Sequence, residues 1–449
     1  MGACPVVLSS LLCVSSVAQS IDASAATQAA QVTAASAKPG ESITLEEAIR
    51  RARANEPNFA AAVSAARVAK LDLALARAAV LPSVVYHNQF LYIEPHHAAG
   101  VDTNQPPRFI GGNAVHEYTS QGVASETIGL QGITAVARAS AAASIARAGL
   151  EVARRGLVAA VVTLYYSALA GDQKLAVAQR AVDESTDFTN LTLHRENARE
   201  AAHADVIKAQ LTAQQRQRDL SDARLAAEKA RLDLGVLLFD DPRTPYTLVP
   251  AVPVEPPARN DAEAAAARNN PDLESALATL HAASLDVIGA RAGYLPDLSL
   301  NFNYGIDSQQ FAIHAPDGSR NLGYSASATL DIPVWDWFSI HDRIKQKTSM
   351  REAARVALTN TQRRLIAQFD EAYNESTVAH DQLQSLADSA ATARESLRLT
   401  RLRYTSGEAT VLEVVDAQSS LTAAEIAHED GIVRYQTALA NLQTLTGNL

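Results

Sequence analysis

Two carboxylates, Glu413 and Asp416, are the side chains whose type and spacing most directly suggest chemistry in this sequence. They lie at the start of a predicted helix just after Gly407, and residues three apart share one face of a helix. Negative charge at this end of a helix is also favoured by the helix dipole. If several copies of the chain surround one opening, these carboxylates form a ring that attracts cations and repels anions. The alternative is an ordinary, solvated and capped helix start.

Histidine offers the next candidate chemistry, because the chain has 11 of them. A possible metal-binding group falls between two predicted strands: Glu94, His96, His97, Asp102 and His116. Zinc needs ligands that converge in an ordered site, and this polar stretch contains Gly-Gly and Pro-Pro pairs. A solvated loop is therefore the favoured interpretation, and we expect no metal. The sequence has no phosphate-binding glycine loop and no nucleophile elbow, so we also expect no cofactor and no enzymatic activity.

Composition narrows the class of protein. The formal net charge of −10 argues against a nucleic-acid partner, which needs a basic face. No stretch reaches the roughly 18 to 20 apolar residues that a membrane-spanning helix requires. A closed β-barrel is then the other way for such a chain to cross a membrane.

The first 18 residues resemble a secretory signal, with an apolar run and Ser16-Val17-Ala18 before a cleavage point. Both cysteines of the chain, Cys4 and Cys13, fall inside it, so the processed chain would have no thiol. Lipidation of Cys13 is the alternative, which the large Leu12 before it disfavours. Residues 19–42 are rich in Ala, Ser, Thr and Gln and are interpreted as a flexible segment.

The rest of the chain is a tandem duplication. Residues 57–82 align without gaps on residues 271–296, an offset of 214, with ten identical pairs that include Pro82 and Pro296. Further along the offset becomes 208, pairing Arg195 with Arg403. The first repeat is predicted to span 43–238, and its parts are a helix, strands at about 81–93 and 118–130, and a helical hairpin at about 134–238. A Pro-rich linker, 239–258, leads to the second repeat, 259–449, with a helix, strands at about 295–307 and 321–333, and a hairpin at about 334–447.

Heptad spacing predicts that the hairpins are antiparallel coiled coils. One such seam is formed by Leu383, Leu386, Ala390, Ala393, Leu397, Thr400 and Tyr404. A single helix over 134–197 would be about 96 Å long, which exceeds the diameter of a globular domain. An isolated coiled-coil rod is the alternative to a channel.

The strands favour the channel. Leu298, Leu300, Phe302, Tyr304 and Ile306 alternate with polar residues, which predicts a strand with one lipid-facing side and one polar side. Two strands in each repeat make four in the chain, and four strands cannot close a barrel. Because open sheet edges are not tolerated in lipid, several copies must share one barrel.

The segment Arg403-Tyr404-Thr405-Ser406-Gly407, followed by an acidic and hydrophobic run that ends in Asp416-Ala417-Gln418, resembles the signature of the TolC-type outer membrane efflux family. Residues 195–210 are a weaker copy, and Ile332-Pro333-Val334-Trp335-Asp336 resembles the turn that follows the last strand in that family. The resemblance implies a duplicated, mainly α TolC-like fold in a homotrimer with a shared twelve-stranded barrel. It also implies a passive exit duct in the outer membrane, in contact with its lipids, with a large periplasmic portion. The partners implied are a periplasmic adaptor and an inner-membrane pump of the RND or ABC type.

The resemblance further implies site residues. Glu413 and Asp416 would line the closed periplasmic entrance, Gly407 would form the tip turn, and Tyr404 and Asp205 would form a latch. For Tyr404 the alternative is a seam residue packed in the coiled coil. The family's basic latch residue falls on Ala409, and the first repeat has Arg199 where the second has Gly407, so the latch is expected to differ. A periplasmic or secreted coiled-coil protein without a pore, structural or of the adaptor kind, is the alternative function.

Overall fold

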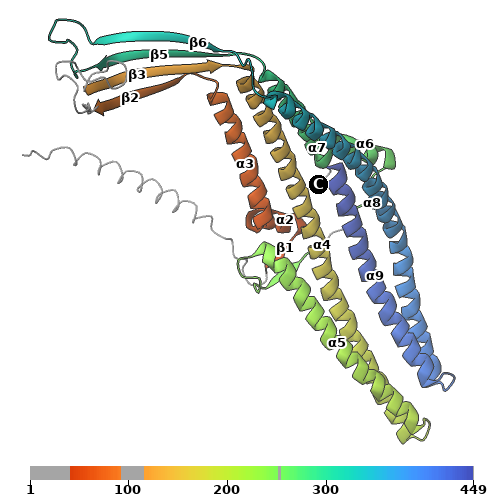
Figure 1. Cartoon of the computed structure of the whole chain (residues 1–449). Helices are drawn as coiled ribbons and strands as arrows, with labels where there is room; N and C mark the ends of the chain where they lie inside the picture. Colours follow the sequence, from red (N-terminus) through yellow and green to blue (C-terminus); the bar gives the residue numbers. More distant parts are fainter. Residues whose placement is uncertain (1–40, 93–115, 251–253, 448–449) are drawn as a thin grey trace, which may run out of the picture.

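The computed structural model describes residues 41–92, 116–250 and 254–447. The predicted signal, nearly all of the segment after it, and the histidine-containing loop up to residue 115 lie outside the described residues. The described chain is elongated, with a sheet at one end and the tips of two helical hairpins at the other (Figure 1).

The two repeats contain the same elements in the same order. The first consists of α2 (Leu45–Asn55), α3 (Pro57–Ala78), β2 (Ser83–Tyr92), β3 (His116–Ile128), α4 (Leu130–Asn197) and α5 (His203–Leu238). The second consists of α6 (Arg259–Asn269), α7 (Pro271–Ala292), β5 (Asp297–Ser308), β6 (Leu322–Asp331), α8 (Ser339–Thr405) and α9 (Val411–Thr446). Corresponding helices have nearly equal lengths, 68 and 67 residues for α4 and α8 and 36 each for α5 and α9.

Each repeat begins with two helices where the sequence predicted one. The break falls at Glu56 and at Asn270, both in extended backbone, and each is followed by a proline at the first helical position. Proline cannot donate the backbone hydrogen bond that would continue the preceding helix, but it is well suited to begin a new one. The Glu56 and Asn270 side chains accept hydrogen bonds from the next helix and so cap it.

The main sheet has the antiparallel order β2-β3-β5-β6. Its central pair, β3 and β5, joins the two repeats, with Gly122 opposite Tyr304 and Ala124 opposite Phe302. Within the described chain the outer strands β2 and β6 each have one neighbour in the sheet, so each leaves one edge open. A second, small sheet pairs β1 (Glu41–Ile43) in parallel with β4 (Tyr246–Leu248).

The largest hydrophobic core lies where this small sheet and α2 pack against the middle of α4. Tyr165 of α4 is fully buried there, and its hydroxyl donates to the Ile43 carbonyl at 3.0 Å. It also accepts from the Val249 amide at 3.1 Å. This contact ties the segments that flank the first repeat to its longest helix.

One described helix, α4, has a window apolar and long enough to cross a membrane, with a mean hydropathy of 1.2. By length and composition, the expectation that no stretch of the chain is apolar enough to span a membrane is therefore wrong for α4. Of that window 44% is buried inside the chain, as expected for a helix that packs against several others.

Candidate functional site at the helical tips

The two hairpins end in the same type of turn. In the second repeat, Gly407 adopts the left-handed conformation (φ 82°) between α8 and α9. The amide of Glu408 donates to the Arg403 carbonyl at 2.8 Å, which closes the end of α8. In the first repeat Arg199 takes the same left-handed conformation (φ 62°), although it has a Cβ that disfavours it.

The predicted acidic pair lies at the beginning of α9, immediately after this turn. Glu413 forms a capping box with Thr410: the Glu413 amide donates to the Thr410 hydroxyl at 3.3 Å, and Glu413 accepts from the Thr410 amide at 3.2 Å. An ion pair with Arg403 at 3.5 Å adds to the cap. Asp416 lies one turn further along and is exposed. Glu413 is therefore engaged in its own helix start, whereas Asp416 faces solvent in the single chain.

The predicted latch residues are not joined within one chain. Tyr404 is only 4% exposed, and its hydroxyl contacts the Thr192 hydroxyl of α4 at 3.4 Å. Its ring packs edge-on against Phe188, with centroids 5.1 Å apart. Asp205 lies in the first turn of α5, and no hydrogen bond in the described residues connects it to Tyr404. Tyr404 is thus a seam residue in the single chain, and the latch to Asp205 stays a prediction.

Arg195, which the sequence analysis noted only as a repeat partner, makes a further contact between the hairpin tips. Its guanidinium donates to the main-chain carbonyl of Tyr404 at the end of α8. The same group lies 4.9 Å from the centre of the Tyr404 ring, within cation–π range. Glu200, on the adjoining turn, lies 3.5 Å from Arg195 Nε, and the Arg195 side chain is 18% exposed. The repeat alignment identified Arg195, but no local pattern in the sequence indicates which carbonyl it reaches.

A second interhelical contact that the sequence analysis missed lies between the tips and the main core. Glu425 of α9 accepts from Arg180 of α4 at 2.9 Å and from Arg394 of α8 at 2.5 Å. Burial alone would raise the pKa of Glu425, but the two arginines lower it below its usual value. Nearby Glu184 is half-buried, and burial raises its pKa. One carboxylate thus joins three helices from both repeats.

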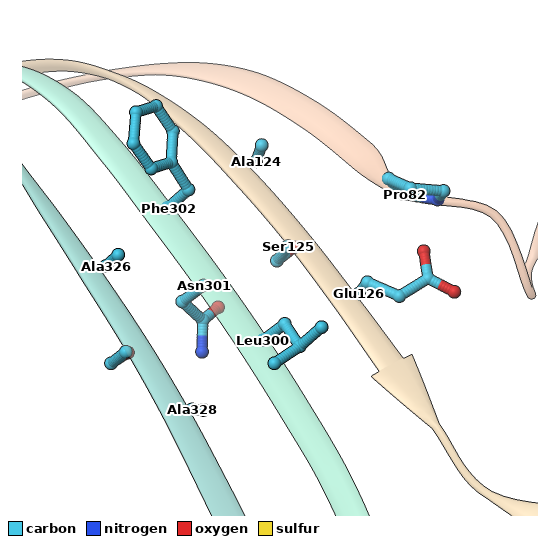
Figure 2. Close-up of a pocket in the computed structure, with 10 residues that line it drawn as sticks. Pro82, Ala124, Ser125, Glu126, Leu300, Asn301, Phe302, Ala326 and Ala328 are labelled. Carbon is cyan, nitrogen blue, oxygen red and sulfur yellow. The ribbon is translucent and has the colours of Figure 1, made fainter.

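Of the five β5 residues predicted to face lipid, the middle three are exposed, whereas Leu298 and Ile306 are half-buried. Leu300, Phe302 and Tyr304 are 38%, 46% and 52% exposed, while the intervening Asn301 and Asn303 are half-buried. A shallow groove of about 430 Å³ crosses β3, β5 and β6, and Figure 2 shows Phe302 and Leu300 among its lining residues. The described residues also contain no group of three or more His, Cys, Asp or Glu side chains placed to hold a metal.

The fold and the tips define the class of protein: a duplicated, mainly helical chain with the architecture of outer membrane efflux channels. Its fold is similar to that of VceC, an outer membrane protein from Vibrio cholerae, with a TM-score of 0.77, 16% identity, and coverage of 90% of this chain and 96% of that one. The CmeC outer membrane channel of Campylobacter jejuni aligns with a TM-score of 0.76 at 15% identity, over 90% of this chain and 85% of that one.

Sequence comparisons point to the same class of protein as the fold does. Residues 264–448 match the family described as "Outer membrane efflux protein". The pyoverdine export outer membrane protein OpmQ of Pseudomonas aeruginosa is 25% identical over 90% of this chain and 83% of its own length. Outer membrane protein OprJ of the same species is 29% identical, over 38% of this chain, and the match spans only 36% of OprJ. In sequence and in fold, the chain is similar to outer membrane efflux proteins of the TolC type.

Proposed function

We propose that this chain is the outer membrane channel of a tripartite efflux or type I secretion system. It forms a homotrimer in the cell outer membrane, with a large periplasmic portion. Solutes enter at the helical tips and leave through a barrel to which each copy contributes four strands. An adaptor and an inner-membrane pump of the RND or ABC type supply the partner contacts and the energy, so the duct itself is passive.

The observation that carries this proposal is the pair of open sheet edges. The described chain has four strands in the main sheet, and its outer strands β2 and β6 each lack a neighbour on one side. Their exposed faces carry Tyr86 and Tyr324, which are 69% and 77% exposed. Unpaired backbone groups cannot remain in lipid. Copies that share a barrel remove both edges, and three copies supply twelve strands.

The helices have matching open sides. Near the sheet, α3 contacts α4, α4 contacts α7 and α7 contacts α8, so α3 and α8 are the outer helices of the described chain. In α3 no residue is buried, although it presents Leu71 and Leu75. A row of four helices with two open sides closes into a ring when α8 of one copy packs against α3 of the next.

The duplication indicates which residues would meet at that border. Within the chain, a Cβ at Gly289 of α7 would lie 3.6 Å from the Thr134 Cβ of α4. Applying the two repeat offsets places Leu75 of α3 against Asp342 of α8 from the next copy. Cβ atoms about 4 Å apart are suitable for a disulfide.

Cysteine cross-linking tests this arrangement. In a background without Cys4 and Cys13, Leu75→Cys with Asp342→Cys should yield dimers and trimers on a non-reducing gel. Gly289→Cys with Thr134→Cys should close the corresponding bond inside one chain and leave a monomer band. A Leu75–Asp342 variant that remains monomeric while the control oxidises would reject the proposed border.

Transport itself is tested by reconstitution. Detergent-solubilised protein should have the mass of a trimer and conduct ions in planar bilayers. A coiled-coil protein without a pore would instead be extracted in aqueous buffer and leave the bilayer silent.

We assign the gate to the tips, with Glu413 and Asp416 as a cation-attracting ring and Tyr404 and Asp205 as the predicted tip latch. The exposure of Asp416 supports a role in that ring. Opening then separates the tips in a population shift between closed and open states.

A further inference from the structure

The side of the main sheet that is predicted to face lipid carries an unsatisfied carboxylate. The strand ladder places Glu126 of β3 directly opposite Leu300 of β5, so the two side chains share this side of the sheet. Oxygen Oε2 of Glu126 is buried and has no hydrogen-bond partner among the described residues. A buried polar atom without a partner costs free energy, so this carboxylate calls for a partner from outside the described chain.

A trio of polar side chains on the same side of the sheet is satisfied internally. Asn88 and Ser120 are opposite each other on β2 and β3, and Ser120 is also opposite Ile306 of β5. The Ser120 hydroxyl donates to Asn88 Oδ1 at 2.7 Å and contacts the Tyr86 hydroxyl at 2.8 Å. Glu126 differs from this trio, because no neighbouring side chain in the described sheet meets the need of its buried oxygen.

The repeat architecture does not require a carboxylate at this position. Ser125 of β3 corresponds to Asp331 of β6, because their ladder partners on β2 and β5 are themselves 214 positions apart. The next residue is Glu126 in the first repeat and Ile332 in the second, and Ile332 is 60% exposed. An apolar side chain is what a lipid-facing position favours. The carboxylate therefore serves a purpose that only the first repeat has.

Glu126 lines the shallow groove of about 430 Å³ that crosses β3, β5 and β6, and Figure 2 shows it at one end of the set of lining residues, next to Pro82. The lining residues on the same side of the sheet as Glu126 are otherwise apolar: Ala124, Leu300, Phe302, Ala326 and Ala328. The small alanines beside two large side chains leave room for a hydrocarbon chain. A ligand that matches this groove is apolar along its length and has a cationic donor at one end.

The depth of Glu126 in the sheet indicates what kind of cation reaches it. Glu126 is two residues before the end of β3 at Ile128, and α4 begins at Leu130. At ~3.3 Å per residue, this is about 7 Å of strand from the helical end of the sheet. A charged side chain at that depth lies near the boundary of the hydrocarbon layer, where it is tolerated far better than at the midplane. Lipid headgroups lie at this level.

We propose that Glu126 and this groove form a binding site for a phospholipid with a primary amine in its headgroup, of which phosphatidylethanolamine is the simplest. One acyl chain packs into the groove, and the ammonium group donates to the Glu126 carboxylate. A hydrogen bond between two charged groups is stronger than a neutral one, and the low dielectric of the hydrocarbon boundary strengthens it further. This inference rests on the proposed membrane location of the main sheet.

Native mass spectrometry of the full-length protein tests the site with a methylation series of one lipid. Phosphatidylethanolamine, its N,N-dimethyl form and phosphatidylcholine carry the same charges and can have the same acyl chains, but their nitrogen loses its N–H donors stepwise. The parent should retain phosphatidylethanolamine about tenfold more tightly than phosphatidylcholine, the order that one hydrogen bond to a charged group provides, with the dimethyl lipid between them. Glu126→Gln should abolish this preference.

Two further variants separate the carboxylate from the groove. Glu117→Gln removes a carboxylate from the same strand but from the other side of the sheet, where Glu117 is opposite Leu91, and it should keep the parent's preference. Ala124→Leu fills part of the groove and should weaken the retention of all three lipids alike.

Two outcomes would overturn the lipid site: equal retention of the three lipids by the parent, or a preference that survives Glu126→Gln. The trimer mass and the bilayer conductance are measured on the same preparations. Conducting trimers that do not distinguish the headgroups would reject the lipid site alone, whereas a chain that neither forms trimers nor conducts would reject the proposed function as well.

Discussion

Removing the Arg195 side-chain charge should open the channel. In the structure this guanidinium bridges the two hairpin tips of one chain, through a hydrogen bond to the Tyr404 carbonyl and a stacking contact with the Tyr404 ring. If opening separates the tips, both contacts are lost in the open state. Arg195→Met retains the aliphatic volume but removes both, so the closed state loses stability relative to the open one.

The size of the effect follows from the two contacts. A hydrogen bond to a charged group contributes about 1.5–3 kcal/mol, and a cation–π contact at an exposed site about 0.5–1 kcal/mol. We take about 2 kcal/mol in total, because Arg195 retains 18% exposure and the ion-pair neighbour Glu200 is well exposed. At tenfold for each 1.4 kcal/mol, this is a factor of roughly 30 in the opening equilibrium. An open population of about 1% would then rise to roughly a quarter.

Single-channel recording in planar bilayers measures this population directly. Arg398→Met is the matched control, because Arg398 is near the tip end of α8 as Arg195 is near that of α4, but among the described residues it pairs only along its own helix, with Glu395 at 2.7 Å. It removes the same charge without breaking the bridge between hairpins. An Arg195→Met channel with the trimer mass of the parent and the open probability of Arg398→Met would refute the bridge.

Three further predictions concern stability and selectivity. Glu425→Gln should lower the free energy of unfolding by about 1–2 kcal/mol at neutral pH, a modest value because both arginine partners are exposed. The pKa of Glu425 is lowered in the folded chain, so the parent loses this stabilisation as the pH falls below the usual value of 4.5. The melting temperatures of parent and variant should therefore converge in acid. Arg199→Gly should stabilise the first tip by about 1 kcal/mol by removing the left-handed strain, whereas an unchanged or lower melting temperature would mean that the Arg199 side chain contributes more than its backbone costs. Glu413→Gln with Asp416→Asn should lower the cation-to-anion permeability ratio measured by reversal potentials, and an unchanged ratio would remove both residues from the conducting path.

The sequence predicted the architecture because the features that specify it are local and occur twice. Paired prolines, the Leu-Pro junctions and the heptad seams each identify an element within a short window, and the confirmed TolC-like fold follows from their order. The start of the second hairpin was less well predicted: it was expected from about residue 334, yet α8 begins at Ser339. The intervening segment, residues 332–338, contains two left-handed residues with large side chains, Trp337 and Phe338, and propensity rules assign such conformations to glycine.

The contacts at the tips could not be predicted from the sequence in the same way. Arg195 and Tyr404 are separated by 209 positions, and Arg180 and Glu425 by 245, so both pairs depend on how two hairpins lie side by side. Helix periodicity identifies which face is buried but not which long side chain extends to a neighbouring carbonyl. The family resemblance directed attention to Asp205 as the partner of Tyr404, while the single chain provides Thr192 and Arg195.

The duplication gives a physical reason for the exposed apolar residues along the helices. Val158 of α4 is 5% exposed, whereas its repeat counterpart on α8, Ile366, is 66% exposed. Val415 of α9 is 9% exposed, and its counterpart on α5, Ile207, is 50% exposed. In each pair the sequence keeps a branched apolar side chain, yet only one copy has a neighbour within the chain. Because α4 lies between α5 and α9 while α8 and α5 border open space, the missing neighbours are those that an adjacent copy would supply. The contact between α4 and α9 is thus a template for the contact between α8 and the next copy's α5. The apolar pattern of α8 is accordingly that of a helix buried on both sides.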